Sequence, residues 1–405
     1  MNALQGSPRI ALFTHDTFGL GHIQRSHHLI QALSERFSEA PILLISGSPV
    51  LHLLKHLPPN ADYVKIPTVV KTGDPASQPS HLPLSVSEII CLRAQIIHQT
   101  MRRFDPDVLI VDNFPLGSNG ELLPTLKEAK RSGTKIILGL RDVIDSSHAV
   151  RAEWKKQRIY DVLDRYYDLI LVYGIQQIFD VIDAYAIPDQ IARKVRYCGY
   201  LTSTAPAANE DPEDVRRELG IQGRMILVTG GGGGDAFPLL STFLEALPKL
   251  AEISALLVLG PMMGPMDREK IRNLANDFSN VVLRNSVPDM ARYMTASDLV
   301  VSMCGYNLAA EIALYRPKAV IVPRTWRYGQ HAQNAQSTDE REQIIRARAF
   351  ARMGLARLIE PKDLTAEHLA EKISEALQQE PPLQQELNVR GLETAANYIQ
   401  EIISG

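Results

Sequence analysis

The sequence has few of the features that mark a secreted, membrane-spanning or nucleic-acid-binding protein. Its 405 residues include only three cysteines, and these are too widely spaced for a disulfide framework or a CxxC metal site. A formal net charge of -3, with no block of Lys or Arg, argues against nucleic acid as a partner. No stretch approaches the roughly 20 apolar residues of a membrane-spanning helix, and the N-terminus lacks a secretory signal pattern. We expect a cytoplasmic protein without a transmembrane segment, with peripheral membrane contact left open.

Short apolar runs alternate with helical patterns along most of the chain. The expected strands are residues 9–15, 42–46, 108–112, 135–140, 169–172, 225–229, 255–259, 281–283, 299–302 and 319–322. Apolar strands separated by helices are typical of parallel sheets that are covered on both faces. The predicted fold class is therefore α/β, with two doubly wound, Rossmann-like domains facing a cleft.

The domain boundaries follow from composition. Residues 203–212 are rich in Pro, Ala and acidic residues, and we interpret them as a linker between domains 1–202 and 213–380. Pro381 and Pro382 end the last pattern of the second domain. Residues 381–405 contain a helical pattern at 384–403, and we expect that helix to leave the second domain and pack back on the first.

Each predicted domain begins with a strand, a glycine turn and a helix. In the first, residues 16–22 contain Gly19, Gly21 and His22; in the second, the five glycines Gly230 to Gly234 lie between strand 225–229 and helix 236–250. Such a junction directs free N–H groups and the positive end of a helix dipole at one point, which suits a phosphate. One or two glycines would serve a tight turn, so five favour a diphosphate lying against the backbone.

The glycines do not fit two common nucleotide motifs. A P-loop needs Lys and then Ser or Thr, whereas Asp235 follows here. A dinucleotide fold wants an acidic residue at the end of the next strand, which here ends at Gly260. A second pattern places Gly305 after a strand and Glu311 on the following helix. Glu311 could accept hydrogen bonds from a ribose diol, or it could be an exposed helix residue.

Together these motifs resemble the GT-B glycosyltransferases of family 28, the family that includes the lipid II-forming N-acetylglucosaminyltransferase. In that family a Gly-rich loop, a Gly-helix-Glu segment and a Gln-x-x-Asn-Ala segment surround a UDP-sugar in the C-terminal domain. Residues 230–234 match the first segment, residues 305–311 the second and residues 343–347 the third, with Arg346 in place of Asn. The residues that the resemblance implies for donor binding are Gly230, Gly231, Gly232, Gly233, Gly234, Val287, Met290, Gly305, Glu311, Glu342, Gln343 and Arg346.

Some residues depart from the family pattern. Leu308 stands where the family carries Thr, and a glycine replaces a Ser of the Gly-rich loop, so backbone N–H groups must do more of the phosphate binding. Asn334-Ala335 offers a rival match to the third segment, but no glycine follows it at the right distance. Residues 65–92 do not match, which leaves the acceptor open and indicates a sparsely characterised bacterial branch.

Inverting transfer needs a base that takes the proton of the acceptor hydroxyl. His22 is the candidate, because family 28 carries His at this turn and its ordinary pKa suits the role; helix capping or acceptor binding are its alternatives. Asp112 and Asp142 follow strands and could orient His22. Asn113 and Arg141, with the turn glycines Gly19 and Gly21, could bind the acceptor, although capping roles are equally open.

Three further segments complete the predictions. Asp105-Pro-Asp107 spells a DxD metal motif, but it precedes a strand, so we interpret it as a turn and expect no essential metal. Residues 326–328 could cover the donor or pack on the surface. The predicted function is inverting, metal-independent transfer of a sugar from a nucleotide sugar, most simply a UDP-sugar, to a hydroxyl acceptor, with no cofactor. The alternatives are a UDP-sugar 2-epimerase, a nucleotide-sugar hydrolase, and a non-catalytic nucleotide-sugar-binding protein.

Overall fold

The computed structural model describes residues 6–14, 21–49, 51, 57–71, 77–79, 82–202, 210–324, 341–380 and 387–405. The chain divides into two compact units, Met1–Thr202 with Asn388–Gly405, and Ser203–Leu387. Gly19, residues 326–328 and Asn334-Ala335, all named above, lie outside the described residues. Within the described ranges, no helix combines the length and the apolar character that a bilayer crossing requires.

The first unit is built on a seven-stranded parallel sheet with the order β3-β2-β1-β6-β7-β8-β9. Its strands are β1 (Ile10–Thr14), β2 (Ile42–Ser46), β3 (Ala61–Lys65), β6 (Val108–Asp112), β7 (Lys135–Arg141), β8 (Leu169–Tyr173) and β9 (Val195–Tyr197). All residues of β1 and β6 are buried, as expected for central strands covered on both faces. Chain order reverses between β1 and β6, so the ends of these two strands form the topological switch point.

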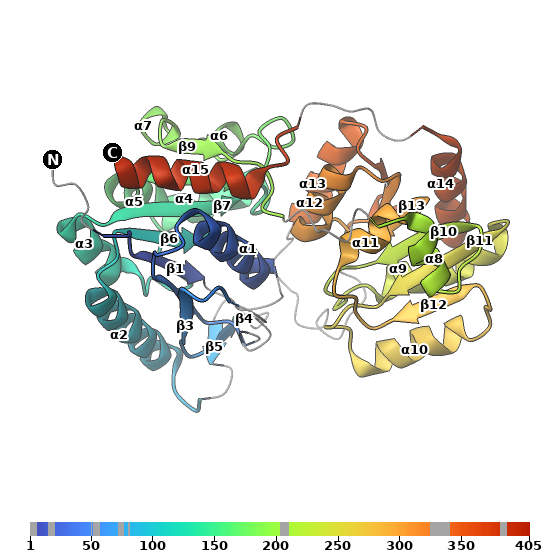
Figure 1. Cartoon of the computed structure of the whole chain (residues 1–405), viewed down its shortest axis with the longest axis horizontal. Helices are drawn as coiled ribbons and strands as arrows, with labels where there is room; N and C mark the ends of the chain where they lie inside the picture. The colour runs from blue at the N-terminus through green and yellow to red at the C-terminus, as the bar shows by residue number, and fades with distance from the viewer. Residues whose placement is uncertain are drawn as a thin grey trace. The chain divides into compact units, whose positions relative to one another are not determined.

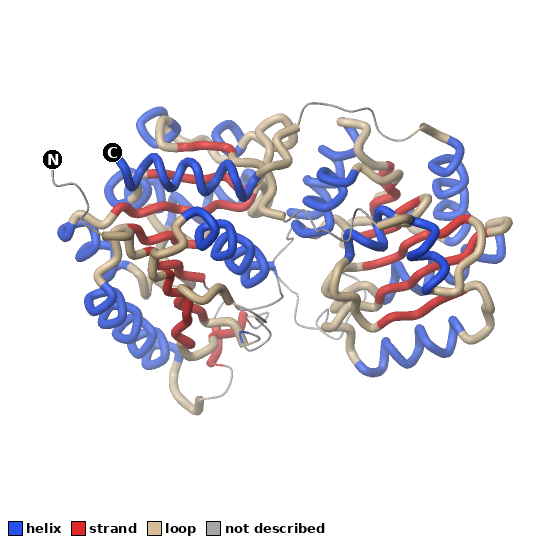
Figure 2. The backbone as a smooth tube through the Cα atoms, viewed as in Figure 1, coloured by secondary structure: helices blue, strands red, loops and turns tan. Residues whose placement is uncertain are grey.

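Helices cover both faces of this sheet (Figure 2). They are α1 (Gly21–Arg36), α2 (Val86–Phe104), α3 (Leu123–Ser132), α4 (Ser147–Lys156), α5 (Ile159–Tyr166), α6 (Val181–Ala184) and α7 (Asp189–Ala192); β4 (Val69–Lys71) and β5 (Ser77–Pro79) form a separate antiparallel pair. Helix α2 begins at Val86 because Ser85 caps its N-terminus and forms a reciprocal capping box with Glu88.

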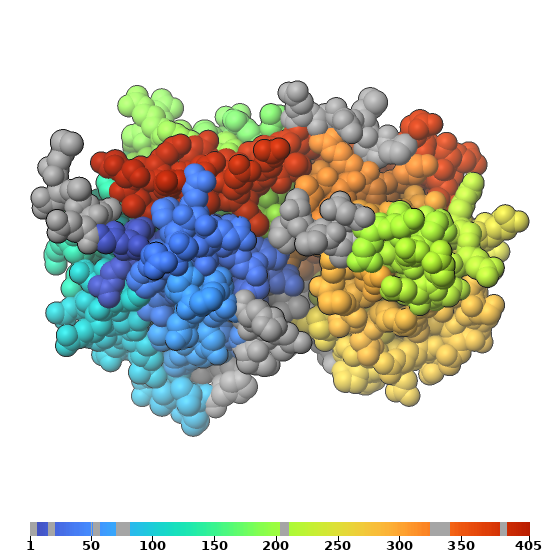
Figure 3. All heavy atoms as spheres, in the orientation of Figure 1, coloured from blue at the N-terminus to red at the C-terminus, as the bar shows by residue number. Residues whose placement is uncertain are grey.

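The last helix, α15 (Gly391–Ser404), also belongs to the first unit and lies against α1 (Figures 1 and 3). Arg36 at the end of α1 donates to Asn397 at 2.7 Å and to Gln400 at 2.6 Å. Gly391 allows the close approach, because a Cβ there would lie 2.1 Å from the Tyr200 carbonyl oxygen. The expected helix over 384–403 thus begins at residue 391.

The second unit repeats the architecture with a six-stranded parallel sheet, order β12-β11-β10-β13-β14-β15. Its strands are β10 (Arg224–Thr229), β11 (Ile253–Val258), β12 (Val281–Arg284), β13 (Leu299–Ser302), β14 (Ala319–Ile321) and β15 (Arg357–Leu358). Here the switch point lies between β10 and β13. The predicted parallel sheets are thereby confirmed in both units.

The helices of the second unit are α8 (Pro212–Glu218), α9 (Phe237–Ala246), α10 (Pro265–Ala275), α11 (Met290–Thr295), α12 (Tyr306–Tyr315), α13 (Glu342–Arg352) and α14 (Ala366–Gln378), with 3-10 turns Leu247–Lys249 and Pro361–Asp363. Helix α9 ends four residues before the expected position, because Pro248 has no N–H to continue it. Sequence reasoning missed the edge strands β3, β9 and β15, which are short or half-exposed and lack a continuous apolar run.

Candidate functional site

The switch point of the first unit brings His22, Arg25 and Asp112 together. His22 is the second residue of α1 and Asp112 the last of β6, and the ring Nδ1 of His22 is hydrogen-bonded to Oδ2 of Asp112. The Arg25 guanidinium lies 3.2 Å from both carboxylate oxygens of Asp112 and 2.8 Å from the same Nδ1. The His22 side chain is 15% exposed and that of Asp112 8%, so the ring is the part of the pair that reaches the surface.

The donor and acceptor roles in this cluster follow from its chemistry. A guanidinium has no lone pair, so Arg25 can only donate. The Asp112 carboxylate can accept from Arg25 and from a protonated Nδ1 of His22 at the same time. With the Nδ1 proton directed at Asp112, Arg25 donates to the carboxylate and not to Nδ1, and Nε2 of His22 keeps its lone pair, ready to take a proton.

Burial, together with two neighbouring arginines, favours that neutral form of the ring. Burial is the largest influence on His22 and lowers its pKa; Arg25 and Arg141 lower it further, and Asp112 acts in the opposite sense without reversing the shift. For Asp112, burial opposes ionisation, but the positive charge of Arg25 and the contacts with His22 outweigh it, so the pKa of this carboxyl lies well below its ordinary value. The site therefore pairs an ionised carboxylate with a neutral imidazole.

The other residues predicted for the first unit serve its framework. Asp142 is fully buried and accepts a hydrogen bond from the Tyr200 hydroxyl at 2.9 Å. Asn113 has a positive φ of 62° and is buried, with its side-chain oxygen 3.4 Å from the backbone N of Arg141. Gly21 is the first residue of α1. Asn113 and Asp142 thus tie the segments that follow β6 and β7 to their neighbours in this unit, and the structure gives Asp142 no exposed surface for an acceptor.

Sequence reasoning missed Arg25. The signal was present, because Arg25 follows His22 by three residues and shares the buried face of α1 with Ile23, Leu29 and Leu33. A charged residue on an otherwise apolar helix face needs a buried partner. Asp112 is that partner, and it lies 87 residues away in the sequence.

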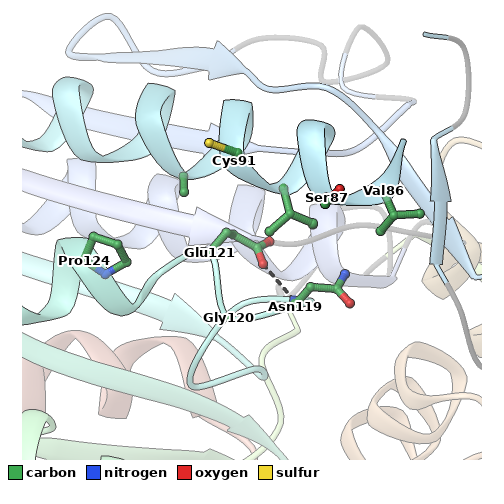
Figure 4. A pocket seen from close by; sticks show the side chains of 9 residues that line it. Val86, Ser87, Cys91, Asn119, Gly120, Glu121 and Pro124 are labelled. Carbon is green, nitrogen blue, oxygen red and sulfur yellow. Dashed lines mark hydrogen bonds between the residues drawn. The ribbon is translucent and has the colours of Figure 1, made fainter. Parts of the chain in front are cut away.

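The first unit also has an open pocket, and none of the predicted site residues lines it (Figure 4). It is formed by one face of α2, including Val86, Ile90 and Cys91, and by the loop at residues 119–124. In Figure 4 the Glu121 carboxylate accepts from the backbone N of Asn119, at 2.7 Å. Since Glu121 is also held by buried Arg93 at 2.8 Å, we interpret the side chains beneath this pocket as structural.

In the second unit the five glycines follow β10, as predicted, and their neighbours explain three of them. A Cβ on Gly230 would lie 2.3 Å from the Ala236 Cβ, and one on Gly233 would lie 2.1 Å from the Leu259 carbonyl oxygen. Gly231 and Gly233 have positive φ angles of 72° and 88°. Gly232 and Gly234 are exposed, and a Cβ on either would meet nothing closer than 3.9 Å, although the Gly232 carbonyl accepts from the backbone N of Met262 at 2.8 Å. These two residues therefore leave one side of the backbone open to solvent.

The Gly305–Glu311 segment lies beside this loop. Gly305 is the N-cap of α12 and faces open space, while Leu308 of α12 would lie 3.3 Å from a Cβ on Gly231. Burial and the nearby Asp289 carboxylate raise the pKa of Glu311 to about 8. Glu311 is thus a half-buried carboxyl rather than a fully solvated one.

The loop before α11 contributes the remaining residues predicted near the nucleotide base. Val287 and Met290 are half-buried, and they flank Asp289, whose carboxylate caps α11 by accepting from the backbone N of Ala291 at 3.0 Å. Since Asp289 also raises the pKa of Glu311, this loop lies close to α12.

The three residues predicted at the sugar all lie on α13 and are buried. Arg346 donates to the Cys304 carbonyl oxygen at 2.9 Å, and Gln343 accepts from the backbone N of Arg324 at 3.0 Å. Glu342 is 9% exposed. Arg346, with no exposed surface, therefore supports the loop before Gly305, and Gln343 supports the end of β14.

The DxD-like segment has structural contacts of its own. Asp105 ends α2 in the left-handed conformation, and the Asp107 carboxylate accepts from the backbone N of Arg9 at 2.7 Å. These contacts fit the interpretation of the segment as a turn leading into β6.

Comparisons with known proteins agree with this architecture. Residues 225–402 match the family model of the glycosyltransferase family 28 C-terminal domain. The UDP-N-acetylglucosamine–N-acetylmuramyl-(pentapeptide) pyrophosphoryl-undecaprenol N-acetylglucosamine transferase 1 of Bacillus cereus is 27% identical over 316 residues, which cover 75% of each chain.

Two solved structures show the same fold. MurG of Acinetobacter baumannii has a TM-score of 0.59 and 16% identity, and UDP-GlcNAc 2-epimerase of Methanocaldococcus jannaschii has a TM-score of 0.60 and 10% identity. Each comparison covers 98% of this chain and 99% of the other. The solved structures show that the fold is of the GT-B class, and the family-model match over residues 225–402 together with the relative from Bacillus cereus supports a glycosyltransferase. Within that class the chain is family 28-like and resembles the lipid II-forming transferases.

Proposed function

We propose that this glycosyltransferase moves a sugar from a UDP-sugar to a hydroxyl acceptor with inversion at the anomeric carbon and without a metal ion. The observation that carries the proposal is the His22–Asp112 pair at the switch point of the first unit. A neutral imidazole oriented by an ionised carboxylate is a general base suited to a hydroxyl.

In the proposed reaction, Nε2 of His22 takes the proton of the acceptor hydroxyl as that oxygen attacks C1 of the sugar. The bond between C1 and the diphosphate oxygen breaks, and its electron pair leaves with the diphosphate. Asp112 holds the His22 ring and stabilises the imidazolium that forms. Attack from the face opposite the leaving group inverts the anomeric carbon.

The second unit would bind the donor. The bare backbone at Gly232 and Gly234 supports diphosphate binding, and the half-buried Glu311 carboxyl supports contact with the ribose hydroxyls. The named activity of the Bacillus cereus relative, which uses UDP-N-acetylglucosamine, supports a UDP-sugar. The contacts of Asp105 and Asp107 within the protein support a mechanism that does not use them for a metal.

A thermal-shift panel of nucleoside diphosphates and their sugars tests the donor. A ligand at a hundredfold its Kd adds about 2.7 kcal/mol to the stability of the state that binds it. We expect UDP and UDP-sugars to raise the melting temperature more than the GDP, ADP and TDP series. Equal shifts for all bases, or none for UDP, would contradict the proposed donor.

Product analysis with and without an acceptor extract separates transfer from its alternatives. Transfer predicts UDP release that depends on the extract and survives EDTA. Isomerised UDP-sugar would identify an epimerase, and free sugar released without an acceptor would identify a hydrolase. A donor that binds and is not consumed would identify a binding protein. Loss of transfer in EDTA with recovery in Mg²⁺ would contradict metal independence.

A further inference from the structure

An ion pair closes the glycine loop of the second unit. Asp235 directly follows Gly234, and its Oδ2 lies 2.6 Å from Nε of Arg324, which follows β14. The side chains of Asp235 and Arg324 are 33% and 28% exposed, so both are partly open to solvent, although the Nε atom of Arg324 is itself buried. The backbone of Arg324 is fixed separately, through its N–H to Gln343.

The other described neighbours of the glycine loop are mostly apolar or backbone groups. Leu308 and Met303 approach Gly231 and Gly230, and the Leu259 carbonyl approaches Gly233. The Thr229 hydroxyl is already engaged with the backbone N of Gly231, at 3.1 Å. Arg268 also lies near the loop, where its guanidinium donates to the carbonyl oxygens of Gly260, which packs against Gly232, and of Met263. Arg324 therefore brings a second positive charge to this loop, from the side of Gly234 and Asp235.

We propose that Arg324 is a diphosphate-binding residue, which Asp235 holds in the free protein and which exchanges this carboxylate for the donor diphosphate. The proposal rests on the proposed function, and it adds a cation that neither the glycine motif nor the Gly305–Glu311 segment supplies. A guanidinium fits phosphate oxygens with two parallel hydrogen bonds. Because both side chains of this pair are partly open to solvent, water weakens the ion pair, and a diphosphate can displace Asp235.

The exchange makes Arg324 and Asp235 act in opposite directions on ligand affinity. Removal of Arg324 deletes the cation that binds the diphosphate. Removal of the Asp235 charge deletes the anion that competes for this cation and repels the ligand. If the pair were only a structural clasp, breaking it from either side would disturb the loop in the same sense.

The test is a calorimetric titration of the full chain with UDP and, separately, with uridine. The variants are Arg324→Gln, Arg324→Lys and Asp235→Asn. The matched control is Arg217→Gln, which breaks an exposed Arg–Asp pair on α8 of the same unit. We expect Arg324→Gln to weaken UDP binding at least about tenfold and to leave the affinity for uridine unchanged, because uridine has no phosphate. The UDP affinity of Arg324→Lys should lie between those of Arg324→Gln and the native protein. Asp235→Asn should bind UDP more tightly than the native protein, and Arg217→Gln should bind UDP with native affinity.

Two results would overturn the role of Arg324. One is native UDP affinity in Arg324→Gln. The other is weaker UDP binding in both Arg324→Gln and Asp235→Asn, with an equal loss of uridine affinity. That result would show that the ion pair only supports the structure of the loop. A native protein that bound neither ligand would instead overturn the proposed donor itself, so the two failures are distinguishable.

Discussion

The two switch points of this protein have the same topology and opposite chemistry. In the first unit, β1 and β6 end at a buried cluster of charged and titratable groups, in which His22, Arg25 and Asp112 contact one another. In the second unit, β10 and β13 end at bare glycine backbone, and the ion pair beside it is partly open to solvent. A parallel sheet supplies the position, and the residues after each strand decide between proton transfer and anion binding.

The comparison also shows that glycine has two different uses in one loop. Gly230 and Gly233 are required by the packing of the protein against itself, whereas Gly232 and Gly234 leave backbone open to a ligand. The five glycines therefore do not all serve the same role. We expect the exposed members to matter most for the proposed diphosphate binding.

The largest expected effect separates the two switch points directly. His22→Ala should lower kcat by roughly 10²–10⁴, because general-base catalysis contributes on this scale. His98→Ala is the control, since His98 of the same unit also pairs with a carboxylate, Glu128, but lies on α2. Turnover measured under saturating donor checks the prediction, and a loss of less than tenfold would remove His22 from the role of base.

A second substitution pair sharpens the distinction among the glycines. Gly233→Ala should destabilise the second unit by at least about 2 kcal/mol, because its φ of 88° and the Leu259 carbonyl 2.1 Å away both oppose a Cβ. Gly232→Ala should change stability by no more than about 0.5 kcal/mol, since its surroundings are open. Unfolding followed by calorimetry measures both variants. Equal destabilisation would contradict the division into structural and ligand-facing glycines.

The third prediction concerns the pH dependence of the second unit. Glu311 has a folded-state pKa of about 8, above its ordinary value of 4.5, so the folded state favours the protonated carboxyl; native stability falls as pH rises from about 4.5 to about 8 and then levels off. Glu311→Gln removes this dependence and should therefore be more stable than the native protein by at least about 1 kcal/mol at pH 8.5, after allowance for partial exposure. At pH 4 the difference should vanish. A stability difference that is the same at both pH values would show that burial does not set this pKa.

The smallest expected effect is a shift in a pH profile of the first unit. Arg25 and Arg141 lower the pKa of His22, and Asp112 raises it. Arg25→Gln should therefore move the acidic limb of kcat/KM to higher pH, because the ring loses a neighbouring cation. Arg36→Gln, on the exposed end of the same helix, is the control and should leave the limb in place. An unmoved limb in Arg25→Gln would assign Arg25 to packing alone.

The sequence alone predicted the strands and glycine turns at the two switch points, but neither the order of the strands in the sheets nor the side-chain contacts. Apolar strands and glycine turns place His22 and Asp112 at strand ends, and parallel strands share one edge, so their approach follows from topology. The contacts of Arg25 and Arg324 with Asp112 and Asp235 depend on side-chain packing between segments 87 and 89 residues apart, which periodicity does not encode. The burial of Arg346 was hidden for the same reason.

The central claim is that the first unit supplies the base and the second holds the donor. Parallel calorimetric titrations of UDP into His22→Ala and Glu311→Ala test it most directly. We expect His22→Ala to bind UDP within about twofold of the native protein, and Glu311→Ala to bind UDP at least about tenfold more weakly, a difference of roughly 1.4 kcal/mol. Native affinity in Glu311→Ala, or a tenfold loss in His22→Ala, would contradict this division of roles.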